Sequence, residues 1–163
     1  MSGRVGADRD AGGVRLVETT AGDAVAERLF AVQEAEIMRR YGGDDPGPRP
    51  PADAPTLLLH AGSEVVGCVA LAAEGGIGEI KRMFVTEAAR GRGHSRVLLA
   101  GVEELAVRHG VTLLRLVTGI EQPEAMALYS SSGYDPIPGF GYWGDEPATR
   151  CYAKRLAPAV PAA

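Results

Sequence analysis

Hydrophobic and polar positions along this chain repeat with two different periods. Alternation with a period of two, or a short apolar run between turn residues, predicts a strand, and apolar positions three and four residues apart predict a helix. The predicted helices run from about Asp23 to Tyr41, from a Gly/Arg-rich turn to about His109, and from Pro123 to Gly133. The predicted strands are 14–20, 56–60, 65–71, 78–85, 112–118, 134–137 and 149–156.

Strands and helices that succeed one another in this way indicate one mixed α/β domain over residues 14–156, with a strand–turn–helix–strand unit at residues 79–118 at its centre. Residues 1–13 and 157–163 show no periodicity and are predicted to be a disordered leader and tail. Residues 44–51 hold four prolines and one glycine, so they form no regular element. They are either a mobile loop over a site or merely a linker.

Composition excludes several classes of function. The net charge of −4 and the pI near 5.4 argue against a surface that holds nucleic acid by its phosphates. No apolar run approaches the roughly 20 residues that span a bilayer. Cys68 and Cys151 stand in strand-like sequence without a CxxC pair, which favours two buried thiols in a reducing cytoplasm. The three histidines have no metal-ligand spacing, so we expect no metal.

The most informative segment is the turn Arg90-Gly91-Arg92-Gly93-His94-Ser95, which leads from a strand into a helix. Backbone N–H groups converge on an anion at such a position, and glycines allow its close approach. A P-loop would need Gly-Lys-Ser/Thr, and a dinucleotide fingerprint would need a third glycine; both are missing here. The segment fits the pattern Arg/Gln-x-x-Gly-x-Gly/Ala and predicts a pyrophosphate cradle.

A second segment, Gln122 to Tyr134, fits the pattern Asn-x-x-Ala-x-x-Leu-Tyr-x-x-x-Gly-Phe with glutamine in place of asparagine. With both segments in this order, the chain resembles the GNAT superfamily of N-acetyltransferases over most of residues 14–156. The resemblance implies a mixed, mostly antiparallel twisted sheet flanked by helices, with acetyl-CoA in the cleft between two central parallel strands. It assigns the pyrophosphate to the amides of Gly91 to Ser95, with Arg90 opening the motif. Ser95 departs from the usual Gly or Ala but is small enough to keep the turn.

Direct attack by an amine needs a base, hydrogen-bond donors to the thioester carbonyl, and an acid for the leaving thiolate. Tyr129 sits where the family commonly places that acid; alternatively it is a packing tyrosine. Glu79 is the candidate base, or else half of a solvated pair with Lys81. In a regular strand Glu79, Lys81, Met83 and Val85 share one face, and Ile80, Arg82 and Phe84 share the other.

The resemblance also implies that the backbone of Met83, Phe84 and Val85 binds the pantetheine arm as an added strand. Gln122 either binds that arm or only caps the helix. The expected activity is acetyl transfer to a primary amine of a small molecule; the alternatives are a non-catalytic CoA-binding regulatory module and a protein acetyltransferase. The resemblance leaves a homodimer open, because many relatives form dimers. The acceptor pocket is expected between the first helix, the Pro-rich loop and the aromatic loop, with these candidate contacts: Glu34, Glu36, Asp44, Asp45, Phe140, Tyr142, Trp143, Arg82 and Arg115.

Overall fold

The computed structural model of the chain describes residues 13–158, so the predicted leader and tail lie largely outside the described residues. Its strands form one seven-stranded sheet in the order β1-β2-β3-β4-β5-β7-β6. Neighbouring strands are antiparallel except for the central pair β4 and β5, which is parallel. The predicted mixed, mostly antiparallel sheet is confirmed. The strands are β1 Val14–Thr20, β2 Pro55–Ala61, β3 Glu64–Glu74, β4 Ile77–Val85, β5 Leu113–Gly119, β6 Asp135–Ile137 and β7 Thr149–Arg155.

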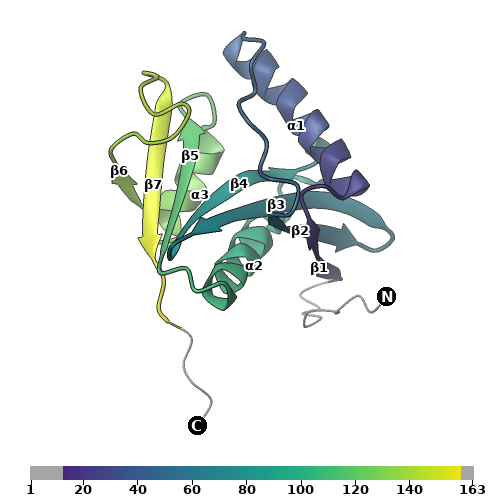
Figure 1. The fold of residues 1–163 in the computed structure, drawn as a ribbon. Helices are drawn as coiled ribbons and strands as arrows, with labels where there is room; N and C mark the ends of the chain where they lie inside the picture. Colours follow the sequence, from purple (N-terminus) through teal and green to yellow (C-terminus); the bar gives the residue numbers. More distant parts are fainter. Residues whose placement is uncertain (1–12, 159–163) are drawn as a thin grey trace.

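Three α-helices flank the sheet: α1 Ala24–Tyr41 on one face, and α2 His94–Arg108 and α3 Pro123–Ser131 on the other (Figure 1). The ends of α1 follow the predicted signals, because the Asp23 carboxylate accepts from the N–H groups of Val25 and Ala26, and Gly42 closes the helix at φ 71°. A short 3-10 helix, η1 Glu87–Ala89, was not predicted. Among residues 13–158, no helix is long and apolar enough to cross a membrane.

Two hydrophobic clusters lie on the two faces of the sheet. Phe30 of α1 packs with Cys68 and Phe84 on one face, and Leu98 of α2 packs with Ile80 and Leu116 on the other. Cys68 and Cys151 are both buried free thiols, as predicted.

A bulge in β4 reverses the side-chain alternation of this strand. Lys81 pairs with Ala70 and Phe84 pairs with Cys68, so β4 has two residues where β3 has one. Arg82, one of the two, has φ 55°, the one positive φ of a non-glycine among the described residues. The prediction that Ile80 and Phe84 share a face is therefore wrong: the two side chains lie in different clusters, and Met83 and Val85 pack on the face of Ile80.

β4 and β5 separate just before the bulge. Their parallel pairing covers only Ile77–Ile80 against Leu113–Leu116, after which β4 stays with β3 and β5 stays with β7. The result is a V-shaped gap in the middle of the sheet, with the C-terminal ends of both strands at its open end.

Candidate active site

A cleft of about 960 Å³ occupies this gap and continues onto both faces of the sheet. It is bounded by β4 and β5, by α1, by the turn before α2, and by α3. All but one of the predicted site residues line it: Glu79, Met83, Phe84, Val85, Arg90, Gly91, Gly93, His94, Ser95, Gln122 and Tyr129. The exception is Arg92, whose side chain is exposed outside the cleft.

The Gly/Arg turn presents a row of unused hydrogen-bond donors. Gly91 and Gly93 have φ 78° and 80°, and Gly93 stands directly before α2 without a side-chain cap. Within the part of the chain that the structure describes, no acceptor is found for the backbone N–H groups of residues 91–96. Six such groups at the N-terminus of a 15-residue helix suit a diphosphate. The residues present therefore fit the phosphate end of coenzyme A.

The arginines of this turn do not all face the anion site. The Arg90 guanidinium points toward α1, where its Nη1 and Nη2 donate to the Glu36 carboxylate at 2.8 and 2.6 Å. Its Nε donates to the Val85 carbonyl at 3.0 Å, and its cation lies 5.5 Å from the centre of the Phe84 ring. Arg90 thus opens the motif in sequence, while its charge is paired with a helix 54 residues upstream.

Arg96 is a cation of this region that sequence reasoning missed. It lines the cleft on the first turn of α2, and its guanidinium donates to the hydroxyls of Ser131 and Ser132 at 3.1 and 3.5 Å. No carboxylate pairs with it among the described residues, so its charge is free for an anion. Its position in the first helical turn after the glycines was the available signal.

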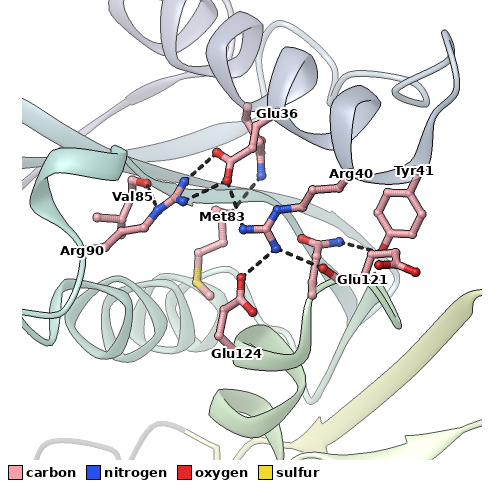
Figure 2. Close-up of polar contacts among 10 residues, drawn as sticks. Glu36, Arg40, Tyr41, Met83, Val85, Arg90, Glu121 and Glu124 are labelled. Carbon is pink, nitrogen blue, oxygen red and sulfur yellow. Dashed lines mark hydrogen bonds and ion pairs between the residues drawn. The ribbon is translucent and has the colours of Figure 1, made fainter.

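A chain of charges joins three elements at the open end of the gap. Figure 2 shows it running from Arg90 through Glu36 and Arg40 of α1 to Glu124 of α3. Arg40 donates to Glu36 at 3.1 Å, to Glu124 at 2.7 Å and to the Glu121 carbonyl at 3.0 Å. The hydrogen bonds from Arg90 hold the pKa of Glu36 below its usual range, so this carboxylate is ionised at neutral pH.

Tyr129 of α3 lies in the cluster beneath the cleft, 5% exposed. Its ring meets Tyr134 edge-on at 5.6 Å and lies 6.2 Å from Tyr152. Within residues 13–158 no hydrogen bond involves its hydroxyl, and burial raises its pKa well above the usual value of a phenol. The side chain is thus packed like a core residue while it lines the cleft with a protonated hydroxyl.

Glu79 and Tyr129 approach the gap from opposite faces. Ile80 and Tyr129 belong to the same cluster, so the neighbouring Glu79 side chain faces the side of α1. Its carboxylate is 25% exposed and lies 3.6 Å from Lys81 Nζ, which is the predicted pair. A group in the gap would have Glu79 on one side and Tyr129 on the other.

One side chain of α1 contacts the backbone that the sequence assigned to the pantetheine arm. Gln33 Nε2 donates to the Met83 carbonyl at 3.0 Å, and its own Oε1 is buried without a partner among the described residues. Sequence reasoning missed Gln33, because nothing local links it to β4. Gln122 makes no capping bond and instead donates to the Tyr41 hydroxyl at 3.3 Å.

Two loops wall the cleft on the side of α1. Arg82 Nη2 donates to the Gly47 carbonyl at 2.9 Å and to those of Pro46 and Pro48 at 3.4 Å. A Cβ on Gly47 would lie 2.6 Å from the indole nitrogen of Trp143, so this glycine allows the aromatic loop to approach the Pro-rich loop. Residues 44–51 are therefore fixed to a neighbouring loop at the cleft, and of the two interpretations the loop over a site fits this placement.

Several predicted acceptor contacts already have partners. The Glu34 carboxylate receives two hydrogen bonds from Arg49, at 2.7 and 2.9 Å, and lies 3.1 Å from Arg82 Nη1. These bonds lower the pKa of Glu34. Arg115 stacks on the Phe140 ring at 4.0 Å and does not line the cleft. Glu34 and Arg115 thus lie outside the cleft lining, and Arg82, which lines the cleft, is already engaged by Glu34 and the Pro-rich loop.

Comparison with known proteins agrees with this geometry. The model of the acetyltransferase (GNAT) family matches residues 19–134. An IAA acetyltransferase from Azospirillum brasilense is 40% identical over 102 residues, which cover 61% of this chain and 67% of that protein. A solved structure from Klebsiella pneumoniae, described as an acyl-CoA N-acyltransferase, has a TM-score of 0.77 at 30% identity over 88% of this chain and 98% of that one.

A GNAT acetyltransferase from Elizabethkingia anophelis, solved with acetyl-CoA bound, shares the fold with a TM-score of 0.69 at 18% identity, over 90% of this chain and 100% of that one. The family model covers more than half of the chain, and both segments that carried the resemblance lie inside the match. The chain therefore belongs to the GNAT family of N-acetyltransferases.

Proposed function

We propose that this acetyltransferase moves the acetyl group of acetyl-CoA to a primary amine of a small molecule, by direct attack of the amine. The observation that carries the proposal is the continuity of one cleft. It joins the unused N–H groups of residues 91–96 on one face to the space beside Glu79 and the two loops on the other, through the gap beside Tyr129. Donor and acceptor can then meet from opposite faces of the sheet.

The residues divide the work of transfer between the two faces. Bound acetyl-CoA supplies an acetyl group activated as a thioester. The amides of residues 91–96 and the Arg96 guanidinium hold its phosphates. Tyr129 Oη carries a proton at neutral pH because burial raises its pKa, and it donates this proton to the departing sulfur. The Glu79 carboxylate accepts the proton of the amine, directly or through a water molecule.

A small acceptor suits the walls on the side of α1. The Pro-rich and aromatic loops touch at Gly47 and Trp143, and the Tyr142 hydroxyl also donates to Asp45. Arg82 holds the Pro-rich loop by donating to the Gly47 carbonyl. Such closed walls favour a compact amine over a protein side chain. The A. brasilense relative is named an IAA acetyltransferase, so IAA belongs among the compounds to test.

The test is a screen of small amines, amino acids, polyamines, aminoglycosides and IAA, with release of free thiol from acetyl-CoA as the readout. A peptide with a free N-terminus and a lysine serves as the protein-like acceptor. Release with a small amine and a linked loss in the Gly93→Ala variant support the proposal. Release only with the peptide contradicts the small-molecule acceptor, and binding of acetyl-CoA without release for any acceptor favours the non-catalytic module.

A further inference from the structure

Three side chains close the open end of the gap between β4 and β5. Glu36 and Arg40 extend from α1, and Glu124 extends from the first turn of α3; together we call them the clasp. All three line the cleft. At one end Glu36 is held by Arg90, in the segment after β4. At the other end Arg40 contacts Glu124 and the Glu121 carbonyl, both in the segment after β5 (Figure 2).

With the clasp across its open end, the gap between β4 and β5 is enclosed as a ring. β4 and β5 form two sides and meet at Ile80 and Leu116, where their pairing ends. The segments that follow the two strands are bridged by the clasp. An acyl-donor arm that passes from the phosphate site, on the face of α2 and α3, to Glu79, on the face of α1, must cross this ring.

The two halves of the clasp differ in strength. Arg90 grips Glu36 through two parallel hydrogen bonds and is itself held by the Val85 carbonyl, so this half is rigid. Arg40 meets Glu124 through one nitrogen, and the Glu124 side chain is 65% exposed. Exposed single pairs are weak and screened by salt. The Arg40–Glu124 contact is therefore the half that opens.

We propose that the Arg40–Glu124 contact opens to admit the acyl-donor arm and closes behind it, so that Arg40 and Glu124 are positioning residues that retain the donor in the gap. The inference rests on the proposed function, because it needs coenzyme A to bind in this cleft. It predicts that the clasp governs how fast the donor leaves, with little influence on the affinity for the acceptor.

The experiment compares Arg40→Met, Glu124→Gln and the double variant with the wild-type enzyme, using the dissociation rate of coenzyme A in stopped flow and the KM of each substrate. Each single variant is expected to release coenzyme A about two- to fivefold faster. The KM of acetyl-CoA should rise while that of the acceptor stays unchanged. The double variant should behave like Arg40→Met alone, because Arg40→Met has already broken the contact that Glu124→Gln removes. High salt should bring the wild type close to the variants.

Arg39→Met is the matched control. Arg39 is the neighbouring cation on α1, exposed and outside the cleft lining, so its loss should leave the release of coenzyme A unchanged. Glu124 is exposed, and its substitution should not perturb folding, which the melting temperature verifies. Unchanged release in both folded single variants would overturn the clasp while leaving the proposed function intact. A wild-type enzyme that does not bind coenzyme A would overturn both.

Discussion

Replacement of Arg82 by methionine tests how the wall of the cleft is held. Arg82 is a buried cation, 7% exposed at its side chain, that contacts the Glu34 carboxylate and three carbonyls of the Pro-rich loop. Methionine keeps most of the apolar length of the side chain and removes every donor. The change leaves Glu34 with Arg49 alone and the loop without its anchor.

The expected loss of unfolding free energy depends on which partners Glu34 keeps after the substitution. Breaking a buried ion pair from one side costs about 3–5 kcal/mol when the remaining charge has no partner. Here Arg49 keeps two hydrogen bonds to Glu34, so we expect a loss below that range, about 2–3 kcal/mol of unfolding free energy. For a domain of this size that corresponds to a fall in melting temperature of about 4–12 °C.

A natural fluorophore lies beside the Pro-rich loop. Trp143 is its one tryptophan and lies against Gly47, so its fluorescence reports the contact between the two loops. Urea unfolding followed by fluorescence and by far-UV circular dichroism separates this contact from the whole fold. In Arg82→Met the fluorescence change should precede the loss of helix signal, whereas the wild type should show coincident transitions. The KM of the acceptor should rise more than that of acetyl-CoA.

Two further variants serve as controls. Arg49→Met removes the exposed partner of Glu34 and should cost less than about 1 kcal/mol. Arg82→Met with Glu34→Gln removes both buried charges and should be more stable than Arg82→Met alone. The reasoning is refuted if Arg82→Met keeps the wild-type unfolding free energy and its two transitions coincide.

Three other substitutions, and one control, have defined outcomes. Tyr129→Phe should keep coenzyme A binding and stability, since no hydrogen bond among residues 13–158 involves the hydroxyl, and should lower turnover about 100-fold; an unchanged rate would make Tyr129 a packing residue. Gly93→Ala should cost about 1–2 kcal/mol of stability and weaken acetyl-CoA binding, because alanine is strained at φ 80° although its Cβ meets open space. Gly42→Ala at φ 71° is the control with similar strain and unchanged binding. Burial raises the pKa of Cys68 to about 12 from 9.0, so its stabilising contribution is complete below pH 9.0 and is lost as pH rises toward 12; Cys68→Ala should flatten that alkaline fall in urea titrations.

The elements of the fold were predictable because their signals are local. Asp23 and Gly42 bracket α1 as a cap and a stop, and the hydrophobic periods gave every strand within a few residues. The turn at Gly91 and Gly93 was also readable, because only its own dihedral angles and the following helix create the anion site. For these features sequence neighbours are also spatial neighbours.

The remaining parts of the site depend on distant pairs. Glu36 and Arg90 are 54 residues apart, Gln33 and Met83 are 50 apart, and no pattern in either segment indicates the other. The bulge at Arg82 was hidden for another reason: Glu79 to Val85 suits a regular strand, and the extra residue shows only in the pairing with β3. Glu34, which the sequence suggested as a contact for the acceptor, is instead paired with Arg49 and Arg82.

The bulge in β4 also bears on insertions and deletions. Without Arg82, residues 81, 83 and 84 would face Ala70, Val69 and Cys68 in an unbroken ladder, with every apolar side chain still on its present face. The apolar side chains of β4 thus alternate as they would in a strand one residue shorter, and Arg82 is the extra residue. Deleting Arg82 should therefore straighten β4, extend its pairing with β5 and narrow the gap in which we propose that the acyl donor lies.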